Sequence, residues 1–120
     1  MPNETENTNT ENGAKPVAIS ALNFKAEVLE SSLPVLVEFW TGWSQPCRVS
    51  DSVLQDVARD LAGKINVVKV DADASLDLSL YYEIQSIPTL IYFVKGRLCF
   101  RIVGTASKEA ILAKLQTFSQ

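Results

Sequence analysis

A nearly continuous apolar run, PVLVEFW at residues 34–40, constrains the fold of this 120-residue chain more than any other feature. A strand that is apolar on both faces needs cover on both faces, which a parallel sheet between two layers of helices provides. Residues 23–31 and 49–61, on either side of the run, have apolar side chains at helical spacing. The sequence therefore predicts an α/β domain with this run as a central strand.

The remaining patterns complete the order β-α-β-α-β-α-β-β-α. Strands are expected at residues 17–20, 65–70, 89–94 and 98–103, with helices at 75–82 and after Ser107, a good N-cap residue. The helix after the central strand is expected to end at Gly63, and Lys95-Gly96 to form a hairpin turn. Strands joined by helices pair in parallel and a hairpin pairs antiparallel, so the sheet should be mixed, with helices on both faces.

Charge and composition divide the chain into two parts. Residues 1–15 are mostly Asn, Thr and Glu, so we expect a disordered polar tail before a domain at residues 16–120. The net charge is −3, and the tail holds three of the fourteen acids, so the domain is nearly neutral and has no field for nucleic acid. No run is long and apolar enough to span a membrane, and no signal peptide is evident. We expect a cytoplasmic monomer.

The chain has two cysteines and no histidine. Catalysis by a Ser-His or Cys-His pair is therefore excluded, and no metal site or other cofactor is expected. Cys99 lies between Leu98 and Phe100 in an expected strand, which favours a buried apolar position. A disulfide between Cys47 and Cys99 is not expected, because the two lie in elements far apart in this topology.

The segment Phe39-Trp-Thr-Gly-Trp-Ser-Gln-Pro-Cys47 connects the central strand to the next helix, where open α/β sheets place their ligand sites. It resembles the thioredoxin family, whose motif Trp-Cys-Gly-Pro-Cys follows a strand that ends in Phe-Trp. The resemblance extends from about Val17 to Leu115 and implies the thioredoxin fold. The matching positions are Trp40, Trp43, Pro46, Cys47, the Ile87-Pro88-Thr89 loop and Gly104.

The chain departs from the family at Ser44, the position of the attacking cysteine. In the family that thiolate attacks a substrate disulfide, and the second cysteine, here Cys47, resolves the mixed disulfide. Serine has no base here to activate it, but it is a preferred N-cap, and Pro46 suits a first helical turn. Ser44 is therefore a helix cap or a ligand contact, and Cys47 is either a packing residue or a single redox thiol. A third possibility is that Ser44 is a cysteine-to-serine change made in the laboratory. A variant made to trap mixed disulfides would, however, keep the attacking cysteine and remove the resolving one, so Ser44 does not fit that design.

Two further positions follow from the resemblance. Glu38 stands where the family has a buried Asp that exchanges a proton with the second cysteine, and Lys69 matches the lysine that pairs with this acid. A structural ion pair between Glu38 and Lys69 is the favoured interpretation, and a proton relay to Cys47 is the alternative. Ser52 replaces a proline that kinks the following helix in the family.

The resemblance also implies a substrate groove. Pro88 would follow a cis peptide bond opposite Cys47, and an extended polypeptide would pair with the backbone of Ile87. Trp43 and Gly104 would border the groove, although these residues could serve the fold alone. Two functions remain open: a thiol–disulfide exchange protein acting on polypeptide thiols or disulfides through at most one thiol, or a redox-inactive module that binds a protein partner in this groove.

Overall fold

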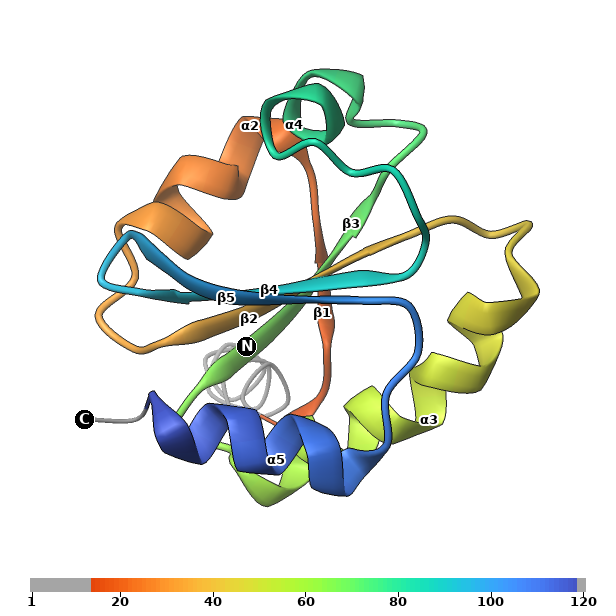
Figure 1. The fold of residues 1–120 in the computed structure, drawn as a ribbon. Helices are drawn as coiled ribbons and strands as arrows, with labels where there is room; N and C mark the ends of the chain where they lie inside the picture. The colour runs from red at the N-terminus through yellow and green to blue at the C-terminus, as the bar shows by residue number, and fades with distance from the viewer. Residues whose placement is uncertain (1–13, 119–120) are drawn as a thin grey trace, which may run out of the picture.

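A five-stranded sheet forms the centre of the protein, a computed structural model of which describes residues 14–118 (Figure 1). The strand order is β1-β3-β2-β4-β5. The strands are β1 Val17–Ile19, β2 Val35–Trp40, β3 Asn66–Asp71, β4 Thr89–Val94 and β5 Arg97–Val103. β2 pairs in parallel with β3 and antiparallel with β4, so the predicted mixed sheet is confirmed. The predicted tail lies mainly in residues 1–13, outside the described residues.

Helices cover both faces of this sheet, as predicted. The helical segments are α2 Ala21–Phe24, the π-helix η1 Lys25–Leu29, α3 Gln45–Asp60, α4 Leu76–Tyr81 and α5 Lys108–Thr117. In Figure 1, α3 and α5 lie on one side of the sheet, and α2 and α4 lie on the other. The order of elements along the chain is the one that the sequence predicts.

Alternation along β2 divides the core into two parts. Leu36 packs on the α3 and α5 side with residues such as Leu54, Tyr92 and Leu115. Val35, Val37 and Phe39 point to the other side and pack there with η1 and its neighbours. Because side chains alternate along a strand, Glu38 shares the face of Leu36, beneath α3.

The hairpin between β4 and β5 turns at Lys95-Gly96, as predicted. Both residues have positive φ, +52° and +79°, which is the backbone of the tight turn that suits antiparallel strands. A Cβ at Gly96 would lie only 2.8 Å from the carbonyl oxygen of Leu29. Glycine therefore provides the turn and also lets the hairpin approach η1 closely.

Three local predictions need correction. The helix expected at residues 23–31 begins earlier, at Ala21, and continues as a π-helix. The helix α3 ends at Asp60 with Leu61 as its C-cap, so Gly63 lies beyond the cap rather than next to it. Cys99 is half-buried, because β5 is an edge strand that α5 covers only in part. With serine at position 52, α3 runs without interruption.

Candidate functional site

The junction between β2 and α3 holds Ser44 at the carboxyl end of the central strand. Ser44 is the N-cap of α3, and its Oγ accepts a hydrogen bond from the backbone N–H of Cys47 at 3.4 Å. Pro46 stands in the first turn, where its missing N–H costs no helical hydrogen bond. The predicted cap is thus confirmed. The hydroxyl is buried and accepts from the backbone of the first helical turn.

Cys47 lies one turn into the helix and is only 5% exposed. Both cysteines are free thiols. A pocket of about 240 Å³ opens beside Cys47 and is lined also by Trp40, Thr41, Gly42, Arg48, Asp51 and Lys69. The thiol is therefore mostly buried, and it is reached through this small pocket.

Glu38 is a buried carboxyl group beneath α3. Neither of its oxygens forms a hydrogen bond, although the Ser50 hydroxyl lies close enough to influence the charge. The pKa of Glu38 is raised from 4.5 to about 7. Burial raises it most, the Ser50 hydroxyl and the charge of Lys69 lower it, and the charge of Asp51 raises it. Near neutral pH this group can therefore hold or release a proton, which an ordinary carboxyl cannot do.

Lys69 does not form the expected ion pair with Glu38. The two residues are register partners in adjacent parallel strands, but Lys69 Nζ lies 3.1 Å from Asp51 Oδ1 on α3. The same ammonium group lies over the Trp40 ring, 4.3 Å from its centre. Asp51 is nearer to solvent than Glu38, so the pair forms where less desolvation is required.

Trp43 is 71% exposed at the tip of the junction. Its indole Nε1 donates a 2.7 Å hydrogen bond to Asp73 Oδ2, in the loop after β3. The Asp73 loop is itself turned by Asp71, whose Oδ1 accepts from the backbone N–H of Asp73 and Ala74. The indole ring is therefore exposed to solvent, and its hydrogen bond to Asp73 fixes its orientation.

The loop before β4 lies at the same edge of the sheet, since Thr89 is the register partner of Phe39. The Ile87–Pro88 peptide bond is cis. The carbonyl of Pro88 accepts a 2.8 Å hydrogen bond from the N–H of Gly104, which has φ +89°. The structure therefore brings Pro88 and Gly104 into direct contact beside the end of β2.

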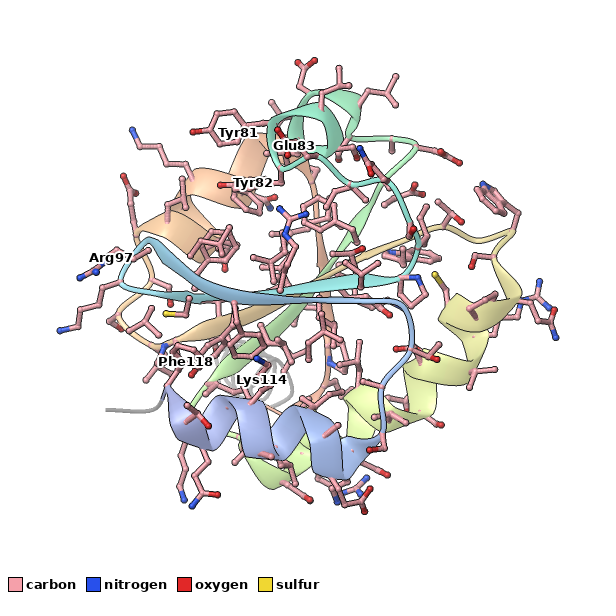
Figure 2. All side chains as sticks on the ribbon, viewed as in Figure 1. Tyr81, Tyr82, Glu83, Arg97, Lys114 and Phe118 are labelled. Carbon is pink, nitrogen blue, oxygen red and sulfur yellow. The ribbon has the colours of Figure 1, made fainter. Side chains whose placement is uncertain are left out.

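Arg101 of β5 holds the other end of this loop. Its guanidinium donates to the carbonyl oxygens of Tyr82 at 2.5 Å and Glu83 at 3.5 Å, where α4 ends. Figure 2 shows Tyr82 and Glu83 at the end of α4. A cation at a helix C-terminus is favourable, and here it also ties the loop to the sheet.

Sequence reasoning missed three residues of this site: Ser50, Asp51 and Asp73. A signal for the first two existed, because residues 47, 50, 51 and 54 follow helical spacing and share the face of α3 that meets the sheet. Asp73 gave no such signal, since its contact with Trp43 joins two loops that only the fold brings together.

Residues 14–118 contain no group of three or more His, Cys, Asp or Glu side chains placed to hold a metal ion. No helix in this range is long and apolar enough to cross a membrane.

Comparison with known proteins gives a consistent result. The sequence profile of the thioredoxin family matches residues 15–117. Thioredoxin 1 of Nostoc sp. is 42% identical over 93 residues, which cover 78% of this chain and 87% of that protein. Thioredoxin C-2 of Corynebacterium nephridii is 40% identical over 91 residues, covering 76% and 84%. Thioredoxin of Synechocystis sp. is 37% identical over 100 residues, covering 83% and 94%.

Proposed function

This chain belongs to the thioredoxin family, and from that premise we propose that it takes part in thiol–disulfide exchange with polypeptides through at most one thiol, that of Cys47. The observation that carries the proposal is Ser44 at the helix cap. Its hydroxyl accepts from the Cys47 N–H at the position where the family's attacking thiol stands.

Loss of dithiol turnover follows from the chemistry of that position. Internal transfer of two electrons needs two sulfurs at the junction, one to attack and one to resolve. A hydroxyl forms no disulfide, and no histidine exists to activate it. The other cysteine of the chain, Cys99, lies on the edge strand β5 and not at this junction.

A single thiol still supports exchange in two steps. The Cys47 thiolate attacks a substrate disulfide, forms a mixed disulfide and releases one substrate thiolate. An external thiolate then attacks the mixed disulfide and releases Cys47. Glu38, with a pKa of about 7, is suited to take the proton of the Cys47 thiol, and its position beneath α3 supports that role.

Reduction of insulin by dithiothreitol tests the proposal. The chain should accelerate the reaction little above background, and Ser44→Cys should raise the rate by orders of magnitude. Ser44→Ala is the matched control, because it removes the hydroxyl without adding a thiol, and it should stay at background. Turnover by the unchanged chain at the rate of Ser44→Cys would refute the proposal.

A redox-inactive binding module is the second candidate function. The observation that favours it is the contrast between the buried Cys47 and the exposed Trp43, which follows the end of β2 where the Pro88 loop also lies. An extended polypeptide would then pair with the backbone of Ile87 as an added strand. Both functions would use the backbone of Ile87, and only thiol–disulfide exchange would also need sulfur.

Insulin chains with carboxymethylated cysteines separate the two candidates, because they offer polypeptide without any thiol or disulfide. Binding that is lost in Trp43→Ala or Ile87→Ala and kept in Cys47→Ala would favour the module. Binding only of chains with free thiols or disulfides, and only with Cys47 present, would favour exchange. In either case we propose a cytoplasmic monomer with polypeptide partners, and the near-neutral charge of the domain argues against nucleic acid or an anionic membrane as the partner.

A further inference from the structure

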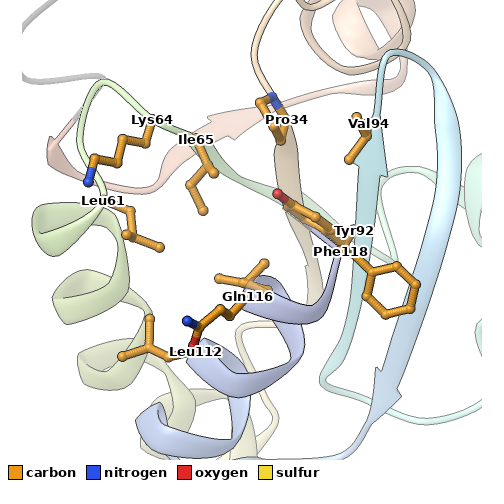
Figure 3. A pocket seen from close by; sticks show the side chains of 10 residues that line it. Pro34, Leu61, Lys64, Ile65, Tyr92, Val94, Leu112, Gln116 and Phe118 are labelled. Atoms are coloured by element: carbon orange, nitrogen blue, oxygen red, sulfur yellow. The ribbon is translucent and has the colours of Figure 1, made fainter. Parts of the chain in front are cut away.

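A second pocket lies at the opposite end of the sheet from Ser44. It has a volume of about 520 Å³ and is lined by Pro34, Leu61, Lys64, Ile65, Tyr92, Val94, Leu112, Leu115, Gln116 and Phe118 (Figure 3). We call it the distal pocket. Pro34 precedes β2 and Ser44 follows it, so the six-residue strand, about 20 Å long, separates this pocket from the Cys47 site.

The walls of the distal pocket are mostly apolar. The loop after α3 supplies Leu61 and Ile65, and the last turns of α5 supply Leu112, Leu115 and the C-cap residue Phe118. Lys64 is the one charged side chain among the lining residues. Sites of roughly 300–1,000 Å³ with apolar walls and few polar groups are typical of small organic ligands.

Tyr92 gives the pocket a buried polar group. The residue is fully buried, and its hydroxyl has no hydrogen-bond partner in the structure. In Figure 3 the hydroxyl points from β4 into the space between Pro34 and Ile65. Burial, with a smaller contribution from Cys99, raises the pKa of Tyr92, so the hydroxyl keeps its proton at neutral pH.

From these observations we infer that the distal pocket binds a small uncharged molecule with a hydrocarbon body and one oxygen, which forms a hydrogen bond with Tyr92. The apolar walls favour a hydrocarbon body, and apolar cavities bind such molecules. One hydroxyl satisfies an oxygen but does not offset the cost of burying a charge, and Lys64, the charged residue of the lining, is exposed to solvent, so an uncharged oxygen fits better than a carboxylate. The inference is independent of the proposed function, since the pocket shares no residue with the Cys47 site.

Titration of the isotope-labelled full chain with 2-naphthol, followed by amide NMR, tests the inference. Saturable shifts should appear at the lining residues of the distal pocket and not around Trp43. Naphthalene has the same ring system without the oxygen and should bind about fivefold more weakly, which corresponds to one net hydrogen bond. Tyr92→Phe should remove this difference and leave the binding of naphthalene unchanged.

A second pair of variants tests the pocket without changing Tyr92, so the test still works if Tyr92→Phe alters the folded structure. Leu112→Trp should fill the pocket and abolish binding of both compounds, while Leu22→Trp, at a fully exposed position, should not. The inference fails if 2-naphthol gives no saturable shift up to its solubility. It also fails if the shifts lie at Trp43 and Ile87, or if Tyr92→Phe leaves the preference for 2-naphthol intact.

Discussion

Lys69 pairs with Asp51, 3.1 Å away on α3, rather than with Glu38, its register partner in the next strand. The carboxyl of Glu38 is consequently buried without a hydrogen bond or an ion pair within residues 14–118, and its pKa rises to about 7. Glu38 is therefore poised to change its charge near neutral pH.

Stability should fall as the pH rises through this range. The pKa of Glu38 is about 7 in the folded protein against 4.5 as the ordinary value. The folded state therefore holds the proton more tightly, and stability from this group is full below pH 4.5 and is lost as the pH approaches 7. The loss should be about 3 kcal/mol, from 1.36 kcal/mol per pKa unit. Urea unfolding of the chain and of Glu38→Gln across pH 4.5–8.5 measures it.

Glu38→Gln should show a flatter profile than the unchanged chain, with a difference that grows until about pH 7 and then stays constant. Glu109→Gln, at an exposed position on α5, is the control and should follow the unchanged chain. Parallel profiles for the chain and Glu38→Gln would show that the acid titrates normally.

The two serine caps should differ in strength. Ser107 Oγ accepts from the Ala110 N–H at 3.0 Å, whereas Ser44 Oγ accepts from the Cys47 N–H at 3.4 Å. Alanine at an N-cap costs roughly 0.5–2 kcal/mol, so Ser107→Ala should lie at the upper end and Ser44→Ala at the lower end. Urea midpoints at one pH compare them. A larger loss at Ser44 would mean that its buried hydroxyl has a further partner.

The Trp43 indole should become more mobile when its acceptor is removed. Asp73→Ala deletes the 2.7 Å hydrogen bond to Nε1, whereas Asp73→Asn keeps an oxygen at the same position. In a Trp40→Phe background, fluorescence anisotropy of Trp43 should decrease in the alanine variant and remain near its original value with asparagine. Stability should change by less than about 1 kcal/mol, because the pair is exposed. Equal anisotropy in all three would show that packing alone directs the ring.

Removing the hydroxyl of Tyr92 should not destabilise the protein. A buried hydroxyl without a partner has lost its hydrogen bonds to water and gained none in return. Tyr92→Phe should therefore keep the free energy of unfolding or raise it by roughly 1–2 kcal/mol. Tyr81→Phe, at an exposed position, provides the baseline. A clear loss of stability in Tyr92→Phe would indicate that a bound water or ligand satisfies the hydroxyl.

The sequence was most informative where local chemistry decides the structure. The apolar run of β2, the Ser44 and Ser107 caps and the Lys95-Gly96 turn were predicted because each depends on residues adjacent in the chain. Alternation and helical spacing then determined the layers of the fold. These features place the candidate site at the end of β2 without any knowledge of distant contacts.

The remaining features depend on which distant residues meet. The partner of Lys69 depends on how α3 lies over β3, and the sequence alone favoured Glu38. The π-helix at Lys25–Leu29 was not predicted, because apolar spacing does not distinguish it from the end of an ordinary helix. The exposure of Cys99 depends on the position of β5 at the edge of the sheet. Its apolar neighbours in the sequence give no indication of that position.

Gly96 and Gly63 offer a matched test of how closely the hairpin approaches η1. Both have strongly positive φ, +79° and +84°, so alanine is strained by a similar amount at either position. A Cβ at Gly63 would have no atom within 4 Å, whereas one at Gly96 would lie 2.8 Å from the Leu29 carbonyl oxygen. Gly63→Ala should cost about 1 kcal/mol, and Gly96→Ala about 2–3 kcal/mol because the hairpin must also move. Urea unfolding gives both values. Equal losses would mean that η1 shifts to make room for the added methyl group at no measurable cost in stability.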